Sequence, residues 1–444
     1  MSKAQAALLS AIKARAARVG VVGLGYVGLP LAITAAQRGF SVTGFDIDPD
    51  KMTLLDAAES YISAVTSDDI AALNASGHFD WTTDFRRLSD CQVIVICVPT
   101  PLTQHREPDL RFVKETATVI ARHMTPGALV ILESTTFPGT TAEVLTPILQ
   151  SHGARSEDDL FVAFSPERED PGNEKYRTSS IPKIVGADGA KARALAKAFY
   201  ADVVDDVVGV SNAATAEAVK LTENIFRAVN IALVNELKVI YDAMGIDVWD
   251  VIDGASTKPF GYMPFYPGPG LGGHCIPIDP FYLTWKARQY ALSTRFIELA
   301  GEINVGMPTY VIGRLREVLD RHCGKGLSKS RVLIIGISYK KNVPDMRESP
   351  SVKLLSLLLD AGAEVDFHDP HIDAIPKMRD YPDFEGRRSV SLKTLGSAEY
   401  DAILISTDHD AVDYTALSET GLPIIDTRNA FARRGLPMHN VTKA

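Results

Sequence analysis

Long apolar runs are absent from this 444-residue sequence, and cysteine is scarce. No stretch approaches the roughly 18–20 consecutive apolar residues that a membrane-spanning helix needs, so no membrane partner is expected. The four cysteines, Cys91, Cys97, Cys275 and Cys323, show no CxxC or other paired spacing. This pattern argues against a disulfide framework or a structural zinc site and fits a reducing compartment. We therefore predict a cytoplasmic protein without a bound metal.

Basic clusters are missing as well. The net charge is −9, and lysine and arginine do not gather into basic runs with aromatic residues, so nucleic acid is not an expected partner. Acidic residues are absent from positions 1–45, where the pattern predicts an Ala-rich basic helix from Lys3 to Arg18. This composition resembles an organelle transit peptide. We expect none, because the helix runs directly into a strand and leaves no room for cleavage.

The bulk composition indicates a globular protein of two or three domains. Hydrophobic residues make up 46% and charged residues 23% of the chain, whose length exceeds what one core usually serves. The first 210 residues alternate short apolar runs with helical patterns, which is typical of βαβ units on a parallel sheet. The expected strands are Val19–Gly23, Val42–Asp46, Val93–Val98, Leu129–Leu132, Phe161–Phe164 and Lys183–Val185.

The pattern changes between Asn212 and Met244, where apolar residues recur at helical spacing without a proline. A helix of this length usually joins domains or forms an oligomer interface. A second βα series begins at Arg331. Its expected elements are Val332–Gly336, Pro350–Ala361, Glu364–His368, Ala402–Ser406 and Pro423–Asp426. We therefore predict an α/β fold with two parallel-sheet domains, 1–211 and 326–444, joined by a central helical domain, 212–325, with one long helix.

A glycine-rich segment, Gly23-Leu-Gly25-Tyr26-Val27-Gly28, follows the first strand and opens a helix. In a dinucleotide-binding unit the first glycine makes a tight turn, the second lets the backbone approach the pyrophosphate, and the third lets the helix pack on the strand. Asp46 ends the second strand, where an acid would bind the adenosine ribose and repel a 2′-phosphate, which favours NAD over NADP. The alternative, a glycine turn and an unrelated solvated acid, explains their coincidence less well.

Two further segments follow buried strands at the edge where α/β sheets place ligands. Val98-Pro-Thr100-Pro follows one strand, and Glu133-Ser134-Thr135 follows the next. Taken alone, either segment fits ordinary loop structure better than a site.

The most informative segment is GLGGHCIPID at positions 270–279. A cysteine in a glycine-rich loop at the start of a helix is expected to be reactive, because unsatisfied N–H groups and the helix dipole lower a thiol pKa there. The alternative for Cys275 is a small core residue, which Cys91 and Cys97 resemble within their apolar strand. His274 could form a Cys–His pair, but adjacent residues at a helix start generally point apart, so we interpret it as loop structure.

Three polar residues of the long helix, Glu217, Lys220 and Asn224, lie at positions i, i+3 and i+7 and share a face. Such a face could donate hydrogen bonds to an oxyanion. The helix alone favours the alternative, a solvated stripe on an exposed surface.

Together these motifs resemble the UDP-glucose/GDP-mannose dehydrogenase family, and within it the enzymes that act on UDP-N-acetylglucosamine in bacterial surface-polysaccharide synthesis. The resemblance runs from about Arg18 to Ala430 and keeps the motifs in the family's order. Besides the Gly23–Gly28 loop and the Lys220/Asn224 helix face, the matching segments are SPER at 165–168, GPGLGGHCIPIDP at 268–280, YKKN at 339–342 and DMRESP at 345–350.

The resemblance implies two Rossmann-like domains, an NAD-binding one and a UDP-binding one, joined by a helical domain that forms a homodimer or a higher homo-oligomer. It implies two successive oxidations of C6 of a UDP-linked sugar, from CH₂OH to carboxylate. Cys275 would attack the aldehyde-level carbon to give a thiohemiacetal, a second hydride transfer would make a thioester, and water would release the acid. Covalent capture solves a real problem, because an aldehyde released after the first step would be lost.

The resemblance also assigns catalytic roles. Lys220 and Asn224 would stabilise developing oxyanions, and a donor of this kind is worth on the order of 3 kcal/mol. Asp279 would orient Lys220 and water. Thr135 and Glu167 would position a catalytic water for proton transfer.

Binding roles come from the same resemblance. Lys340 and Arg428 match residues that contact substrate phosphate or sugar, and Arg347 matches one that reaches the nicotinamide cofactor. The strand ending at Gly336 lacks a second GxGxxG, which favours UDP there over a second dinucleotide. The expected cofactor contacts are Gly23, Gly25, Tyr26, Val27, Gly28, Asp46, Thr100, Thr135 and Arg347. The expected substrate contacts are Glu167, Arg168, Lys220, Asn224, Gly272, Lys340 and Arg428.

The sequence departs from the UDP-glucose members at two places. Arg168 stands where they carry an aromatic residue, and LGGH at 271–274 replaces their FGGS. Both changes resemble the N-acetylhexosamine branch, and the tract MPFYPGP at 263–269 favours its N-acetylglucosamine enzymes. UDP-N-acetylmannosamine and UDP-glucose remain alternative substrates. Two other classes fit less well. A non-catalytic nucleotide-sugar sensor would not need Cys275, and an epimerase would need a Tyr-x-x-x-Lys pair that residues 26–51 lack.

Overall fold

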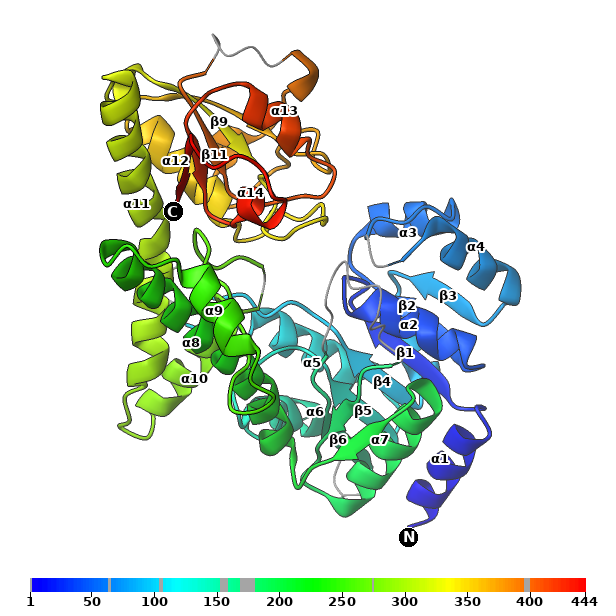
Figure 1. The fold of residues 1–444 in the computed structure, drawn as a ribbon. Helices are drawn as coiled ribbons and strands as arrows, with labels where there is room; N and C mark the ends of the chain where they lie inside the picture. The colour runs from blue at the N-terminus through cyan, green and yellow to red at the C-terminus, as the bar shows by residue number, and fades with distance from the viewer. Residues whose placement is uncertain are drawn as a thin grey trace. The chain divides into compact units, whose positions relative to one another are not determined.

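The computed structural model describes residues 2–62, 65–103, 107–151, 159–167, 180–273, 275–394 and 400–444. These residues form two compact units (Figure 1). Unit 1 comprises Met1–Glu223 and Phe281–Ser293, and unit 2 comprises Asn224–Pro280 and Thr294–Ala444. The long helix α8 (Ala213–Ala243) contributes residues to both units. The finer division into three domains at 211 and 325 stays a prediction.

Unit 1 is built on a six-stranded parallel sheet in the order β3-β2-β1-β4-β5-β6. Its strands are β1 (Arg18–Val22), β2 (Ser41–Phe45), β3 (Phe79–Thr82), β4 (Val93–Ile96), β5 (Ala128–Leu132) and β6 (Leu160–Phe164). The strand order reverses between β1 and β4. Doubly wound sheets bind ligands at the carboxyl ends of the strands that flank such a reversal.

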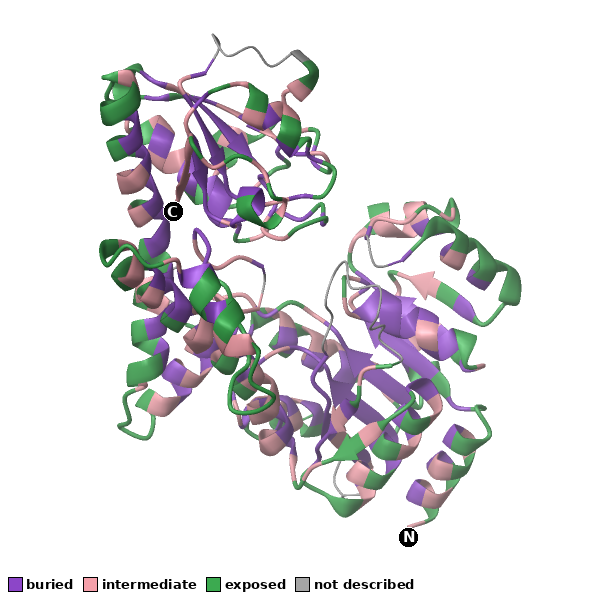
Figure 2. Ribbon diagram, viewed as in Figure 1, coloured by how far each residue is buried: buried purple, intermediate pink, exposed green. Residues whose placement is uncertain are grey.

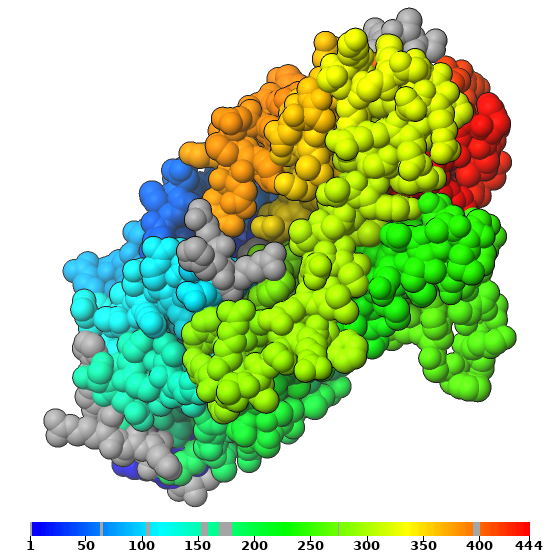
Figure 3. Space-filling model, turned by 90° about the vertical axis from the view of Figure 1, so that its left-hand side faces the viewer, coloured from blue at the N-terminus to red at the C-terminus, as the bar shows by residue number. Residues whose placement is uncertain are grey.

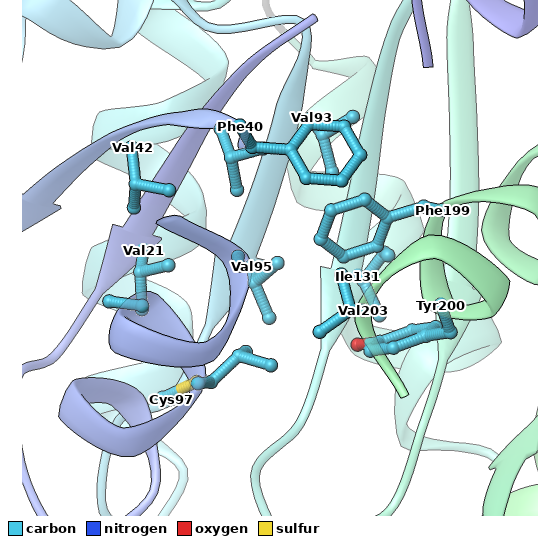
Figure 4. Close-up of a cluster of buried hydrophobic side chains, with 14 of the residues drawn as sticks. Val21, Phe40, Val42, Val93, Val95, Cys97, Ile131, Phe199, Tyr200 and Val203 are labelled. Atoms are coloured by element: carbon cyan, nitrogen blue, oxygen red, sulfur yellow. The ribbon is translucent and has the colours of Figure 1, made fainter. Parts of the chain in front are cut away.

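Helices cover both faces of this sheet, which explains why its strands are apolar on both sides. One face packs on α1 (Lys3–Lys13), α2 (Gly28–Gln37), α4 (Ser67–Ser76) and α7 (Ala190–Val203). The other packs on α5 (Arg111–His123) and α6 (Thr146–Gln150). The central strands are buried (Figure 2). In the first layer Val21, Val95 and Ile131 of the sheet gather with Phe199 and Tyr200 of α7 (Figure 4).

The predicted strand Lys183–Val185 is present with the expected bounds, but it does not join the main sheet. This segment forms β7 (Lys183–Val185), which pairs in parallel with β8 (Val207–Gly209) in a separate two-stranded sheet. An antiparallel bridge between Phe164 and Gly186 ties the end of β7 to the end of β6. β7 therefore lies outside the six-stranded sheet, against the carboxyl end of β6.

Unit 2 contains a second parallel sheet in the order β10-β9-β11-β12-β13. Its strands are β9 (Arg331–Ile335), β10 (Glu364–His368), β11 (Ala402–Ile405), β12 (Ile424–Asp426) and β13 (Val441–Lys443). One face packs on α11 (Arg295–Cys323) and α12 (Pro350–Asp360), and the other on α13 (Tyr414–Glu419) and α14 (Ala430–Arg433). Helix α11 forms a yellow-green to yellow band on the surface of this unit (Figure 3).

The fold class is thus as predicted, with two Rossmann-like parallel-sheet domains and a helical region between them in the chain. That region holds most of α8, together with α9 (Val248–Ser256), α10 (Asp279–Arg288) and α11. Strand and helix bounds differ from expectation mostly by one or two residues. The first helix is shorter than predicted, because it ends at Lys13 rather than Arg18. The short strands β3, β8 and β13 were not predicted, since each has few residues and partly exposed side chains.

The same glycine turn follows β1 in the first sheet and β9 in the second. Gly23 and Gly336 follow β1 and β9 with φ of 93° and 82°, and their N–H groups donate to the last residues of β2 and β10 at 2.7 and 2.8 Å. The next N–H donates to an aspartate just beyond that strand, Asp46 or Asp369, at 2.9 Å in both cases. Positive φ is accessible to glycine at little cost, so the two domains use the same turn.

Candidate active site

The glycine loop after β1 has the space that a dinucleotide needs. A Cβ at Gly28 would lie 1.8 Å from the backbone oxygen of Gly23, so the close packing of α2 on the loop requires glycine there. A Cβ at Gly25 would meet nothing within 4 Å. The protein's own packing therefore does not require Gly25, whereas a pyrophosphate laid on the backbone does. Helix α2 begins at Gly28 after Val27, whose side chain cannot cap it, and the Leu29 N–H already donates to the backbone oxygen of Gly25 at 3.1 Å, so the Gly28 N–H is the one at the helix start that suits an anion.

Asp46 lies beside this loop, as predicted. Its Oδ2 accepts hydrogen bonds from the Leu24 N–H at 2.9 Å and from Lys51 Nζ at 2.7 Å, and its Oδ1 accepts the Asp48 N–H at 3.1 Å. The carboxylate is thus aimed by its neighbours, and Oδ1 keeps acceptor capacity for a ribose hydroxyl. Lys51 was missed from sequence, although a lysine five residues after an acid at a helix start is a recognisable partner.

The loops that follow β4 and β5 are linked to each other. Thr100 Oγ1 donates to the backbone oxygen of Thr135 at 2.5 Å, and Ser134 Oγ donates to the backbone oxygen of Val98 at 2.5 Å. The hydroxyl of Tyr282 donates to the backbone oxygen of Thr100. Thr100 and Thr135, both predicted cofactor contacts, therefore lie together at the carboxyl edge of the sheet next to β1.

Glu167 and Lys220 also lie together. Lys220 Nζ donates to the backbone oxygen of Glu167 at 2.5 Å, and the Glu167 side chain is buried. Glu217, on the same face of α8, has a structural role instead. Its carboxylate accepts the N–H groups of Gly139 at 2.5 Å and Thr141 at 2.8 Å, which holds the loop after β5. Burial raises the pKa of Glu217, although these hydrogen bonds oppose the shift.

Asn224 is held on both sides of its amide. Its Nδ2 donates to Asp279 Oδ2, and its Oδ1 accepts from Arg227. Because a carboxylate only accepts and a guanidinium only donates, these two partners fix which way the amide faces. One N–H of Nδ2 remains for another acceptor. The predicted pairing of Asp279 with Lys220 stays a prediction.

Cys275 stands where the first turn of α10 begins. Its backbone oxygen accepts the Asp279 N–H at 2.8 Å and the Ile278 N–H at 3.1 Å. The residue is partly exposed. Cys91 and Cys97 are buried, and burial raises the pKa of both thiols, to about 12 for Cys91. The structure therefore distinguishes Cys275 from the two core cysteines, as predicted.

The glycines that precede Cys275 lie against loops of the second sheet in the same unit. A Cβ at Gly272 would lie 2.6 Å from Tyr339 Cβ, and the Gly273 N–H donates to the backbone oxygen of Arg347 at 3.0 Å. A Cβ at Gly268 would lie 2.5 Å from Nη1 of Arg428. The glycines are thus explained by close approach of the cysteine loop to the segments that carry the predicted substrate residues.

The basic residues of those segments are held in different ways. Arg428 Nε donates to the backbone oxygen of Ser406 at 2.7 Å, and burial lowers the pKa of its guanidinium. Arg347 donates to both carboxylate oxygens of Asp345, from Nε to Oδ1 at 3.0 Å and from Nη2 to Oδ2 at 2.6 Å. Lys340 directly follows Tyr339 and is partly exposed.

Asp369, which follows β10 of the second sheet, accepts several hydrogen bonds from nearby protein groups. Asp369 Oδ2 accepts from the N–H of Ser338 at 3.1 Å, from Ser338 Oγ at 3.0 Å and from His409 Nε2 at 3.1 Å. Burial alone would raise the pKa of Asp369, but the His409 hydrogen bond and charge lower it to about 2. The difference from Asp46 lies at Oδ2, which in Asp369 accepts from the buried Ser338 and His409 side chains and in Asp46 accepts from Leu24 and Lys51.

Two predicted residues, Arg168 and His274, lie outside the described residues. In the described part of the chain, no group of three His, Cys, Asp or Glu side chains could hold a metal ion. No described helix has the length and apolar character needed to cross a membrane.

Comparison with known protein families shows which family the chain belongs to. The NAD binding domain of the UDP-glucose/GDP-mannose dehydrogenase family matches residues 17–204, the family's central domain matches 214–305, and its UDP binding domain matches 333–433. The chain belongs to this family. It is therefore an NAD-dependent dehydrogenase, and the glycine loop after β1 lies in its NAD-binding domain.

Individual family members resemble the chain over most of its length. UDP-N-acetyl-D-glucosamine 6-dehydrogenase of Pseudomonas aeruginosa is 36% identical over 397 residues, covering 88% of this chain and 90% of that protein. UDP-N-acetyl-D-mannosamine dehydrogenase of Pyrococcus horikoshii is 34% identical and covers 87% and 94%. A solved structure of the UDP-D-ManNAc dehydrogenase from that organism matches with a TM-score of 0.84 at 33% identity, covering 93% of this chain and 96% of that one.

Sequence reasoning missed one buried group beside the predicted site. Lys183, in β7, is 4% exposed and contacts the carboxylate of Glu167. A signal was present, because a lysine inside a short apolar strand must find a partner when that strand is buried.

Proposed function

We propose that this chain catalyses the NAD-dependent, four-electron oxidation of C6 of a UDP-N-acetylhexosamine to the uronic acid, with Cys275 as covalent nucleophile. The favoured substrate is UDP-N-acetylglucosamine, and the product would serve as a precursor of surface polysaccharide. The observation that carries the proposal is the packing of the Cys275 loop, through Gly268 and Gly272, on the segments that hold Arg428 and Tyr339.

Arg428 is suited to hold the diphosphate of a UDP-sugar. Its Nε is engaged by Ser406, whereas Nη1 and Nη2 make no hydrogen bond to the described residues and lie against Gly268. Two parallel N–H donors of a guanidinium match two phosphate oxygens. A diphosphate bound there would bring the attached sugar toward the loop of Cys275, and Lys340 would add a second positive charge.

In the proposed reaction, bound NAD⁺ supplies the hydride acceptor. The Cys275 thiolate attacks C6 at the aldehyde level, which gives a thiohemiacetal, and loss of a second hydride leaves a thioester. Lys220 and the free N–H of Asn224 donate to the oxygen of C6 as negative charge develops on it. The fixed orientation of the Asn224 amide, set by Asp279 and Arg227, supports this role.

Release of the product needs water. The water oxygen adds to the thioester carbon, the carbon–sulfur bond breaks, and the thiolate of Cys275 leaves. We assign Thr135 and Glu167 to position this water, with the Glu167 carboxylate accepting its proton. The burial of the Glu167 carboxylate and its contact with Lys183 support the assignment.

The choice of sugar rests on fine distinctions. The relatives named for UDP-N-acetylglucosamine and UDP-N-acetylmannosamine are 36% and 34% identical to the chain. The tract at 263–269 favours the former. The proposed domain roles, an NAD-binding 1–211, a helical 212–325 and a UDP-binding 326–444, agree with the three matched family domains.

A substrate panel tests the proposal. NADH formation is measured with UDP-N-acetylglucosamine, UDP-N-acetylmannosamine, UDP-N-acetylgalactosamine and UDP-glucose at equal concentrations. We expect the highest kcat/KM with UDP-N-acetylglucosamine. A higher value with any other sugar would overturn the substrate assignment, and no turnover with all four would overturn the activity.

A further inference from the structure

A cluster of charged side chains is buried behind Glu167 in unit 1. Lys183 Nζ donates to Glu133 Oε2 at 3.1 Å and contacts the Glu167 carboxylate, and the Tyr200 hydroxyl donates to Glu133 Oε1. The side chains of Lys183, Glu133 and Glu167 are 5%, 0% and 4% exposed. Burial this complete is rare for three ionisable groups and demands that each find its partner inside the protein.

The formal charges in this cluster balance. Glu133 and Glu167 bring two negative charges, and Lys183 brings one positive charge. Lys220, whose Nζ bonds to the Glu167 backbone, brings the other positive charge. Burial raises the pKa of Tyr200 well above its ordinary value, so its hydroxyl acts as a neutral donor. Burial lowers the pKa of Lys183, while Glu133 opposes that shift.

Backbone hydrogen bonds hold Lys183 next to the carboxylate of Glu167. The Phe164 N–H donates to Gly186 at 2.8 Å and the Gly186 N–H donates back at 3.0 Å. Ser165 Oγ donates to the backbone oxygen of Ile184 at 2.8 Å. These bonds fix β7 against the segment 164–167. Because β7 lies outside the main sheet, its first residue, Lys183, comes next to Glu167.

Glu167 thus joins two lysines. Its backbone oxygen holds Lys220, and its carboxylate meets Lys183. Glu133 accepts from the Lys183 ammonium group, and Tyr200 in turn donates to Glu133. Cys97, which is buried and neutral because burial raises its pKa, also faces this cluster. Tyr200 lies at the edge of the apolar layer beside Ile131 and Val203 (Figure 4).

We propose that Lys183 is a positioning residue for the hydrolysis of the thioester, because it holds the Glu167 carboxylate ionised and in place, with Glu133 and Tyr200 fixing Lys183. This inference rests on the proposed function, in which Glu167 takes the proton from water. A nearby cation favours the charged form of a carboxylate, and a second carboxylate disfavours it. Removal of Lys183 leaves Glu133 and Glu167 to repel each other in a buried setting.

The test separates hydrolysis from oxidation. UDP-N-acetylglucosamine and NAD⁺ are mixed rapidly with enzyme, and the initial burst of NADH is compared with the steady rate. We expect Lys183→Met to keep the burst and to slow the steady rate on the order of 10- to 100-fold, within what a general base contributes. Equal loss of burst and steady rate would show a structural role and overturn the proposal.

A double-mutant cycle gives the control. If Lys183 acts through Glu167, Lys183→Met should have little further effect on the steady rate in a Glu167→Gln background. An effect of the same size in both backgrounds would contradict the proposal. Glu167→Gln turnover that equals the unsubstituted rate would instead contradict the role of Glu167 in the proposed function.

The pH profile of the steady rate gives an independent readout, because Glu133→Gln and Lys183→Met should shift its acidic limb in opposite directions. In Glu133→Gln the positive charge of Lys183 acts on Glu167 alone. The pKa of Glu167 should fall, so the acidic limb of the steady rate should move to lower pH. In Lys183→Met it should move to higher pH. Limbs that stay in place in both variants would overturn the proposal. No turnover by the unsubstituted enzyme would overturn the proposed function and is thus distinguishable from failure of this inference.

Discussion

Gly268 lies against the guanidinium group of Arg428, where a Cβ would come within 2.5 Å of Nη1 and 3.1 Å of Cζ. Both residues belong to unit 2, and the contact places the start of the Cys275 loop on a predicted phosphate ligand. The relationship explains why the loop begins with glycine. A substitution at Gly268 should therefore displace the guanidinium group of Arg428 without removing its charge.

Gly268→Ala should displace Arg428 and weaken substrate binding. We expect KM for the UDP-sugar to rise about tenfold, which corresponds to about 1.4 kcal/mol, with a smaller change in kcat. The matched control is Gly254→Ala, because a Cβ at Gly254 in α9 would meet nothing within 4 Å. Steady-state kinetics at saturating NAD⁺ measure both. An unchanged KM in Gly268→Ala would separate Arg428 from substrate binding.

Gly25→Ala should separate folding from cofactor binding. The added methyl group meets no protein atom within 4 Å, so the melting temperature should stay within about a degree of the parent. The same methyl group would occupy the space proposed for the pyrophosphate, so the Kd for NAD⁺ should rise at least tenfold. Calorimetric titration with NAD⁺ measures this. Normal affinity in this variant would place the pyrophosphate elsewhere.

Much of this arrangement could be predicted from the sequence, because local patterns specified it. The βαβ periodicity located the strands of both sheets except β3 and β13, and the Gly23–Gly28 spacing located the loop beside Asp46. The position of β7 could not be predicted in this way. Ile184 and Val185 are apolar like the residues of the main sheet, and only the long-range pairing of β7 with β8 and the bridge between Phe164 and Gly186 set its place. Lys183 was missed for the same reason.

The chemistry around Asn224 and Asp369 shows a second limit. Helical spacing put Asn224 on a face with Lys220 and places Arg227 beside it at i+3. It could not show that Asp279, 55 residues later in the chain, accepts from the other side of the amide. Likewise, His409 lies 40 residues from Asp369 in the chain. Contacts of this kind depend on the packing of loops, and no local pattern encodes them.

Acid should weaken unit 2 through Asp369. The pKa of this residue is lowered from 3.8 to about 2, so its contribution of about 2 kcal/mol is present above pH 4 and is lost as pH falls toward 2. The free energy of unfolding of the parent and of Asp369→Asn is measured by urea titration between pH 2 and pH 7. We expect a constant gap above pH 4 that closes below it. A gap that persists at pH 2 would contradict this assignment.

Helix α8 carries an apolar stripe that we propose as a homodimer interface. Phe226, Leu233 and Ile240 recur every seven residues and are 46%, 49% and 47% exposed. Leu233→Asp should therefore shift the chain from dimer to monomer in light scattering coupled to size exclusion. Arg316→Glu, an exposed charge change on α11, is the control and should leave the mass unchanged. A monomeric parent, or a dimeric Leu233→Asp variant, would contradict this proposal.

The four-electron oxidation is tested most directly by letting the reaction run to completion and counting the NADH molecules formed per UDP-N-acetylglucosamine consumed. Oxidation past the aldehyde through a Cys275 thioester predicts two NADH per sugar and a uronic acid product. Cys275→Ser should bind both ligands yet fail to release the acid. A ratio of one NADH per sugar, or normal acid release by Cys275→Ser, would contradict the covalent four-electron reaction.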